Sequence, residues 1–509
     1  MHDNNNNNNK RIAKNTILLY VRMFVTMLVG LFTSRVVLDV LGVDDFGIYN
    51  VVGGFVSMFA IVRAGLVSST QRFLTYDLGK GDYEGLRKTF STITLIYIIL
   101  CAIVFVIAEF GGIWFIENKL SIPSNRLDAS HWVFQFSLIT LIVTLLSNSY
   151  NSLIIAHEKM KAFAYITIYE VVAKLLVAYL LYVTTYDKLI VYAVLLCAVQ
   201  VTVPLLYWLY CQRNFREEVR MIWSLDWRKV GEIYAFAGWS MMGGIANIGF
   251  TQGLNMLLGI FFNPVVNAAR GVAVQVQSLV TQFVTNFQMA VDPQIIKSYA
   301  RGDINYMSKL ISTSSRFSYF LLLFISLPLM LETETLLGWW LVEAPNDTAL
   351  FFRLIVITTM FDAISNPYGK AIQATGKIRN YQIVCSSILL FIVPVSYIVL
   401  KLGAPAYSVF IVHIVLGLVA MLCRIHIADR VVNVSFSHFI KKTALPILMV
   451  SVISVIVPFS VHSLIEQGVV RFFDVGFACV FSVGCTIFML GLSKTERKEV
   501  IDKFRNLKK

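Results

Sequence analysis

Long apolar runs separated by short polar stretches recur along the whole chain. A membrane-spanning helix needs about 20 mainly apolar residues, because the hydrocarbon core is about 30 Å thick and each helical residue advances about 1.5 Å. Runs of this length lie near residues 15–37, 47–69, 89–109, 131–155, 162–184, 189–211, 234–258, 266–290, 310–331, 348–369, 381–400, 404–423, 443–463 and 472–491. The pattern predicts an all-α polytopic membrane protein with about fourteen transmembrane helices.

The composition excludes a soluble globular protein. Hydrophobic residues make up 57% of the chain and charged residues 14%, whereas roughly a quarter of the residues in soluble domains are charged. The net charge of +13 could indicate nucleic-acid binding, but the basic residues gather between the apolar runs. Alternate segments hold 32 Lys and Arg on one side of the membrane and 5 on the other, so the positive-inside rule predicts that both termini are cytoplasmic.

An internal repeat divides the predicted helices. The segment 147–161 matches 365–379 at an offset of 218 residues, after the fourth and tenth runs, and 76–82 matches 299–303 after the second and eighth. Both matches indicate a unit of six helices, and because six is even, the two halves have the same orientation in the membrane. We expect an N-lobe over 14–211, a C-lobe over 234–427 and two additional helices over 443–491.

Three segments lie outside these helices. Residues 1–13 contain a run of asparagines and are expected to be cytoplasmic and disordered. Residues 212–233 mix basic side chains with Trp223 and Trp227, as expected of an amphipathic linker at the cytoplasmic membrane surface. Residues 492–509 form a basic cytoplasmic tail.

Several short motifs resemble one transporter family. The segments 34–42 and 45–49, together with the turn 79–82, are similar to the Wzx-like oligosaccharide flippases of bacterial polysaccharide export. This family belongs to the MOP superfamily, with the MATE drug transporters and the lipid II flippase. The resemblance covers roughly residues 10 to 425. The two additional C-terminal helices resemble those of the lipid II flippase, where the pair forms a groove for the lipid tail.

The resemblance implies both a fold and a function. Two six-helix lobes form a V around a central cavity and give alternating access to it. A lipid-diphosphate-linked oligosaccharide then moves from the cytoplasmic to the periplasmic leaflet of the bacterial inner membrane, for O-antigen, capsule or exopolysaccharide synthesis. The implied partners are this lipid-linked oligosaccharide and membrane lipid, with a polysaccharide polymerase or chain-length regulator as a candidate protein partner.

Basic residues inside the predicted helices are candidates for substrate binding. Each costs about 2.5 to 3.5 kcal/mol at a lipid-facing helix centre, so it must face water, pair with another group or extend to the membrane surface. A guanidinium binds phosphate oxygens in a bidentate manner and stays charged. The lipid II flippase has functional arginines on its first, second and eighth helices. The candidates on the corresponding helices are Arg22, Arg35, Arg63 and Arg270, with structural pairing as the alternative.

Amide side chains mark the eighth run. Gln275 and Gln282 lie on one face of 266–290 and would be poorly soluble in lipid. The second run, 47–69, carries a stripe of small and polar residues, for which close helix packing is the alternative interpretation. We expect both helices to line a hydrated cavity.

Acidic groups inside the membrane are candidates for ion coupling. Glu170 and Lys174 have the spacing of an intrahelical ion pair, which would serve either to couple transport to an ion or only to hide two charges. Asp362 has no oppositely charged residue one turn away and is a further candidate. We expect no cofactor or metal, although coupling to H⁺ or Na⁺ is open.

Two other functions, a drug antiporter and a polysaccharide polymerase or ligase, are alternatives to the flippase. A MATE-type cation-coupled drug or toxin antiporter would favour an acidic cavity, whereas basic residues outnumber acidic residues inside the predicted spans. A membrane polysaccharide polymerase or ligase usually needs a sizeable outer loop, and the longest outer segment, 110–130, is short. The sequence also lacks a nucleophile elbow and a phosphate-cradling glycine motif, so we do not expect an enzyme.

Overall fold

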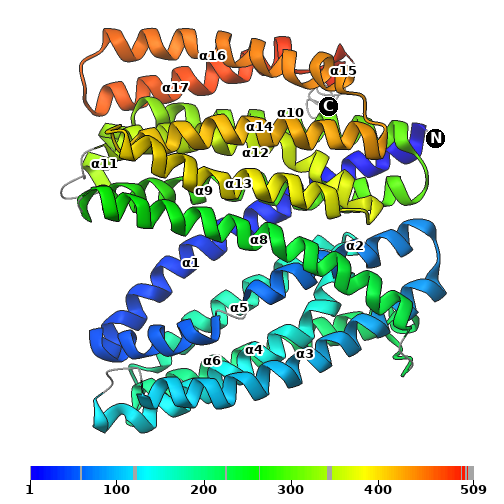
Figure 1. Cartoon of the computed structure of the whole chain (residues 1–509), viewed down its shortest axis with the longest axis vertical. Coiled ribbons are helices and arrows are strands. Elements are labelled where there is room, and N and C mark those ends of the chain that lie inside the picture. The colour runs from blue at the N-terminus through cyan, green and yellow to red at the C-terminus, as the bar shows by residue number, and fades with distance from the viewer. Residues whose placement is uncertain are drawn as a thin grey trace, which may run out of the picture. The chain divides into compact units, whose positions relative to one another are not determined.

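The computed structural model describes residues 2–57, 60–118, 123–223, 226–262, 264–340, 347–494, 496–498 and 501, and every regular element within them is helical (Figure 1). Eleven helices of the described chain are long and apolar enough to cross a membrane. They are Arg11–Gly42, Tyr83–Asn118, Ser124–Ala156, Met160–Leu180, Lys188–Asn214, Ile304–Leu331, Thr348–Thr375, Arg379–Lys401, Ser408–Val432, Phe436–Leu464 and Val469–Gly491. The predicted all-α membrane architecture is confirmed.

The described residues of the remaining three predicted runs are also helical. The run 47–69 is divided between the end of α1 (His2–Ser57) and α2 (Ala60–Lys80), with residues 58–59 outside the described ranges. The runs 234–258 and 266–290 lie on α8 (Trp227–Phe261) and α9 (Pro264–Ala300). Small and polar residues lower the apolar content of the runs on α8 and α9, which separates these two runs from the eleven.

A kink divides α1 into two helical stretches. Gly42 has φ 76° and ψ 173°, a conformation in which a side chain would clash with the backbone. Glycine lets the chain change direction there at low cost. The structure begins α1 at His2, so it has helix across the asparagine run for which the sequence predicts disorder. Most of the predicted basic tail, 492–509, lies outside the described residues.

The chain forms two compact units, Met1–Gly244 and Ile245–Lys509, and their boundary falls within α8. The first unit contains α1, α2, α3 (Tyr83–Asn118), α4 (Leu127–Ala156), α5 (Met160–Leu180), α6 (Lys188–Asn214) and α7 (Arg216–Val219). The second contains α9, α10 (Ile304–Leu331), α11 (Thr333–Trp340), α12 (Thr348–Thr375), α13 (Arg379–Lys401), α14 (Ser408–Val432), α15 (Phe436–Phe439), α16 (Leu445–Leu464) and α17 (Val469–Thr486).

The two units repeat the same helix pairings. In the first unit α4 packs against α2, α3 and α6, and in the second α12 packs against α9, α10 and α14. These are the pairings expected if the second set of helices repeats the first. The additional helices α16 and α17 pack against each other and against α10 (Figure 1). The helix pairings thus agree with a repeated set of helices to which α16 and α17 are added.

The turns after α2 and α9 show the repeat at atomic detail. Gly81 and Gly302 have φ values of 74° and 75°. In the first turn Asp82 Oδ1 accepts a hydrogen bond from the Gly85 amide at 2.8 Å, and in the second Asp303 Oδ1 accepts one from the Tyr306 amide at 3.0 Å. The Gly-Asp pair thus ends one helix with a left-handed glycine and caps the next with a carboxylate.

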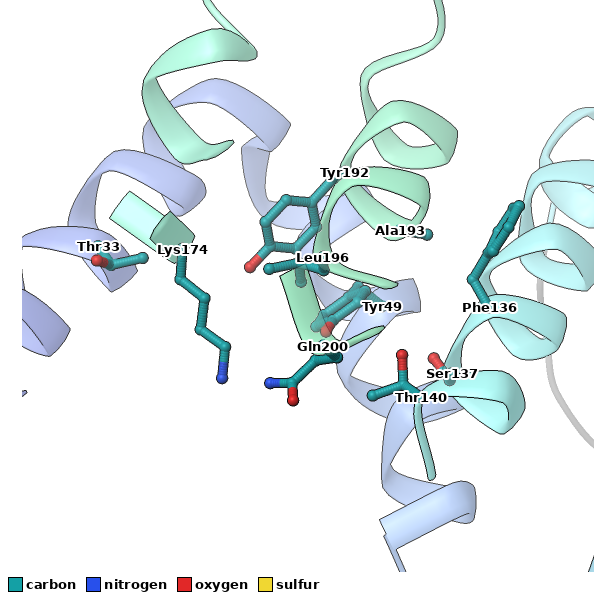
Figure 2. A pocket seen from close by; sticks show the side chains of 10 residues that line it. All are labelled: Thr33, Tyr49, Phe136, Ser137, Thr140, Lys174, Tyr192, Ala193, Leu196 and Gln200. Atoms are coloured by element: carbon teal, nitrogen blue, oxygen red, sulfur yellow. The ribbon is translucent and has the colours of Figure 1, made fainter. Parts of the chain in front are cut away.

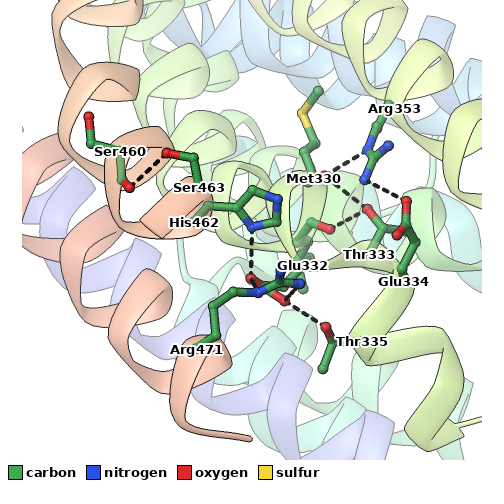
Figure 3. A network of polar contacts seen from close by, with 11 residues as sticks. Met330, Glu332, Thr333, Glu334, Thr335, Arg353, Ser460, His462, Ser463 and Arg471 are labelled. Carbon is green, nitrogen blue, oxygen red and sulfur yellow. Dashed lines mark hydrogen bonds and ion pairs between the residues drawn. The ribbon is translucent and has the colours of Figure 1, made fainter. Parts of the chain in front are cut away.

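A buried carboxylate ties the additional helices to α10 (Figure 3). Glu332, between α10 and α11, is 1% exposed. One of its oxygens lies 2.9 Å from His462 Nδ1 of α16 and 2.8 Å from Arg471 Nε of α17. The other accepts hydrogen bonds from Thr335 Oγ1 at 2.6 Å and Arg471 Nη2 at 3.1 Å. We call Glu332, Thr335, His462 and Arg471 the Glu332 clamp.

Candidate functional site

Arg270 is a buried arginine with neutral partners. It lies on the first turns of α9 and is 6% exposed. Its guanidinium donates to the side-chain oxygen of Asn255 and, at 3.3 Å, to the backbone carbonyl of Thr251, both on α8. No carboxylate of the described residues forms an ion pair with it. Hydrogen bonds therefore fix its position, and the described part of the chain supplies no counter-ion for its guanidinium.

The other predicted arginines lie in the first unit. Arg22 of α1 is half-buried and stacks over the Phe163 ring of α5, 4.7 Å from its centroid. Arg35, also on α1, is exposed, and Arg63 on α2 is half-buried. In the part of the chain that the structure describes, Arg35 and Arg63 make no ion pair with a carboxylate. The first unit thus also carries arginine charge inside the predicted membrane region.

The amides of α9 fall on two different faces. Gln275 and Gln282 are exposed, whereas Gln277 and Gln288 hydrogen-bond within the second unit. Gln277 donates to Thr359 Oγ1 at 2.9 Å and Gln288 to Ser318 Oγ at 3.0 Å. Packing therefore explains the second pair but leaves the amides of Gln275 and Gln282 available to solvent or a ligand.

Glu170 and Lys174 form the predicted ion pair on α5. The Lys174 ammonium lies 2.7 Å from Glu170 Oε1, and the same oxygen accepts a hydrogen bond from Gln200 Nε2 of α6 at 2.9 Å. Lys174 and Gln200 border a cavity of about 250 Å³ within the first unit (Figure 2). Its other lining residues are Thr33, Tyr49, Phe136, Ser137, Thr140, Tyr192, Ala193 and Leu196. The ion pair is confirmed, and the cavity beside it was not predicted.

Asp362 lies on α12 and is exposed. One turn further along α12, Ser365 and Asn366 accept hydrogen bonds of 2.8 and 2.9 Å from the guanidinium of Arg424. Arg424 lies just beyond the predicted run 404–423, but α14 continues through it to Val432. The apolar run ends before the helix does, so run length alone could not reveal this arginine. The sequence feature that could have pointed to this contact is the pair Ser365 and Asn366, which repeats residues 147–148 of the first unit.

The predicted site residues occupy several regions of the chain. Arg22, Arg35 and Arg63 belong to the first unit, and Arg270 to the second. Among the predicted site residues that the structure describes, direct contact is seen between Glu170 and Lys174. No group of three or more His, Cys, Asp or Glu suitable for a metal ion occurs among the described residues.

Comparison with known proteins gives a family match and several structural matches. The family model described as polysaccharide biosynthesis protein matches residues 12–299. No curated protein matches the sequence. An outward-facing multidrug resistance MATE family transporter of the MOP superfamily has a TM-score of 0.71 and 13% identity, covering 84% of this chain and 96% of its own.

Two further structures show the same similarity. A MATE structure in the straight conformation has a TM-score of 0.70 and 14% identity, covering 83% of this chain and 97% of its own. A MOP superfamily transporter from Pyrococcus furiosus, described as having a binding pocket of reverse polarity, has a TM-score of 0.68 and 14% identity. It covers 84% of this chain and 96% of its own. At these identities the matches show a shared fold.

Proposed function

Because the chain belongs to the polysaccharide biosynthesis protein family, whose members are MOP-type membrane transporters, we propose that it moves a lipid-diphosphate-linked oligosaccharide across the inner membrane. In this proposal both termini are cytoplasmic and the substrate passes from the cytoplasmic to the periplasmic leaflet by alternating access. Transport needs no cofactor and no enzymatic step. A polysaccharide polymerase or chain-length regulator then receives the exported product.

The observation that carries this proposal is the burial of Arg270 away from any described carboxylate. It is buried among neutral hydrogen-bond acceptors, and no described carboxylate neutralises it. A charge held in this way attracts an anion strongly, because it is less screened than one in water. The substrate's diphosphate supplies such an anion, and its oxygens match the guanidinium fork.

The remaining candidates have supporting roles in the proposal. Arg22, Arg35 and Arg63 of the first unit extend the positive field, and Gln275 and Gln282 contact the polar saccharide. Glu170 with Lys174, and separately Asp362, are the candidate groups for coupling to H⁺ or Na⁺. Protonation of Glu170 would release the Lys174 ammonium, which lies 2.7 Å from it, and would thereby change the local charge.

The proposal is tested by replacing the arginines in a strain whose chromosomal copy is deleted. Arg63→Ala and Arg270→Ala should each lower surface polysaccharide about tenfold or more, because a lost charge-assisted hydrogen bond is worth about 1.5 to 3 kcal/mol. Arg353→Ala is the matched control. Arg353 is also inside a predicted span, but it is bonded to the Met330 carbonyl at 2.8 Å and paired with Glu334.

Immunoblotting of membranes checks that every variant accumulates. Full export by the Arg63→Ala/Arg270→Ala double variant would contradict the proposal. The drug-antiporter alternative is tested in the same strains. If deletion increases sensitivity to cationic drugs without changing surface polysaccharide, the protein is an antiporter and not a flippase.

A further inference from the structure

The cavity of the first unit is lined by hydroxyl groups that are not hydrogen-bonded to the described residues. Four hydroxyl-bearing residues, Tyr49, Ser137, Thr140 and Tyr192, line it. Their side-chain hydroxyls make no hydrogen bond to any described residue. Tyr49, Ser137 and Thr140 are only partly buried, so their hydroxyls are open to water or to a ligand in the cavity. Gln200 adds a free carbonyl oxygen, because its amide nitrogen is already engaged by Glu170.

The cavity also presents aromatic surface. The rings of Tyr49 and Tyr192 meet edge to face, with centroids 5.0 Å apart and an angle of 61° between their planes. Phe136 of α4 adds a third ring, and Figure 2 shows Ser137 and Thr140 coming from the same helix. Hydroxyls interleaved with aromatic rings suit a ligand that has both apolar C–H faces and a rim of hydroxyl groups.

Charge and volume narrow the class of ligand. Lys174 lines the cavity and its ammonium is paired with Glu170 at 2.7 Å, so the positive charge on this side of the cavity is compensated. A diphosphate would find no excess positive charge there, and a metal cation would find no excess negative charge. The cavity volume of about 250 Å³ is about eight times the ~30 Å³ that one molecule occupies in liquid water. It lies just below the range of about 300 to 1,000 Å³ that is typical of pockets for drug-sized ligands.

We propose that this cavity is a binding site for a single neutral sugar ring. The inference rests on the proposed function in one respect, namely that the ring belongs to the lipid-linked oligosaccharide. Tyr192, Thr140 and Ser137 donate and accept hydrogen bonds with the ring hydroxyls, Tyr49 and Phe136 cover its C–H faces, and Gln200 with Lys174 closes the polar side. The saccharide and the diphosphate of one substrate are then recognised by different groups.

Saturation-transfer NMR on the full-length protein in detergent micelles tests the site. The probes are the methyl glycosides of glucose, galactose, mannose and N-acetylglucosamine, with NaCl and inorganic phosphate as separate competitors. At least one glycoside should receive saturation from the protein, and neither competitor should displace it. Tyr192→Phe keeps the ring and removes one hydroxyl, so it should weaken binding about threefold to tenfold.

A second variant and a control make the result decisive. Ser137→Ala/Thr140→Val should weaken binding in the same way without altering the aromatic rings. Tyr210→Phe is the matched control, because Tyr210 is also on α6 but does not line the cavity, and it should bind like the wild type. The absence of saturation transfer to every glycoside, transfer unaffected by both site variants, or displacement by sodium or phosphate would overturn the proposal.

The two proposals fail separately. If the arginine variants lose export while no glycoside binds, the flippase function stands and the sugar site is wrong. If a glycoside binds through Tyr192 while the arginine variants export normally, the sugar site stands and the diphosphate-binding function is wrong.

Discussion

Replacing Glu332 with glutamine should loosen the attachment of α16 and α17. The exchange conserves shape but removes the charge that faces Arg471, whose side chain is 12% exposed. Removing one partner of a buried ion pair typically costs about 3 to 5 kcal/mol, because the other charge is left buried without compensation. Taking the lower value, the population in which α17 is detached should rise about a hundredfold.

Cys479 reports this detachment. It lies on α17 and is 0% exposed, so a thiol reagent reaches it when the helix separates from its neighbours. In a chain whose other six cysteines are alanine, a fluorogenic apolar maleimide in detergent should label Cys479 about a hundredfold faster in Glu332→Gln. The control Glu334→Gln removes a carboxylate that is 64% exposed and 3.4 Å from Arg353, and should change the rate less than about fivefold.

Equal labelling rates in Glu332→Gln and the wild type would refute the clamp as an attachment. A rescue variant sharpens the test. Glu332→Met combined with Arg471→Leu removes both charges, and apolar replacement of a buried pair is often neutral, so labelling should return toward the wild-type rate. If the double variant labels as fast as Glu332→Gln, the uncompensated charge is not the cause.

Acid should open the same clamp. Burial raises the pKa of Glu332, but hydrogen bonds from Thr335, Arg471 and His462 outweigh it, so the pKa is lowered from its usual 4.5. A carboxylate with a lowered pKa stabilises the fold above its unfolded-state pKa and loses that contribution as the pH falls through the folded-state value. The difference in melting temperature between the wild type and Glu332→Gln should therefore persist at pH 6 and shrink below about pH 4.5. A difference that disappears above pH 5 would contradict this assignment.

Two further predictions concern the repeat and the last helix. Gly302→Ala should lower the melting temperature, because at φ 75° an L-residue costs about 1 to 2 kcal/mol, whereas Gly231→Ala, in open space on α8, should raise it. A higher melting temperature for Gly302→Ala would contradict this reading of the turn. Arg316→Gln should speed labelling of Cys479 more than tenfold, because the Arg316 guanidinium holds the Gly491 carbonyl and Glu496, each at 2.8 Å. Unchanged labelling would show that these contacts do not secure α17.

The architecture could be predicted because its signals are local. Run length predicts helices wherever apolar residues continue for about 20 positions. The repeat could be located because its turns need particular residues: only glycine adopts a φ near 75° freely, and the aspartate after it caps the next helix. The Glu170–Lys174 pair followed from the same kind of rule, since residues four apart share a helix face.

Contacts between distant segments could not be predicted. Gln200 is 30 residues from Glu170, and Asn255 is 15 residues from Arg270, and no sequence pattern connects them. Arg424 lies outside the predicted run 404–423, because α14 extends beyond its apolar residues and polar partners such as Ser365 hold the arginine there. The cavity arises from four helices that meet only in the folded unit, so neither its volume nor its unused hydroxyls could be inferred from the sequence.

The Glu332 clamp also sets an order of events during biosynthesis. Arg471 follows Glu332 by 139 residues, so at about 5 to 20 residues per second the ribosome needs roughly 7 to 30 s to supply it. Throughout this interval the Glu332 carboxylate at the end of α10 has no Arg471 to bind. A nascent chain that stops before α17 therefore lacks the arginine of the clamp and keeps Thr335 and His462 as the partners of Glu332, which distinguishes a truncated product from a finished one.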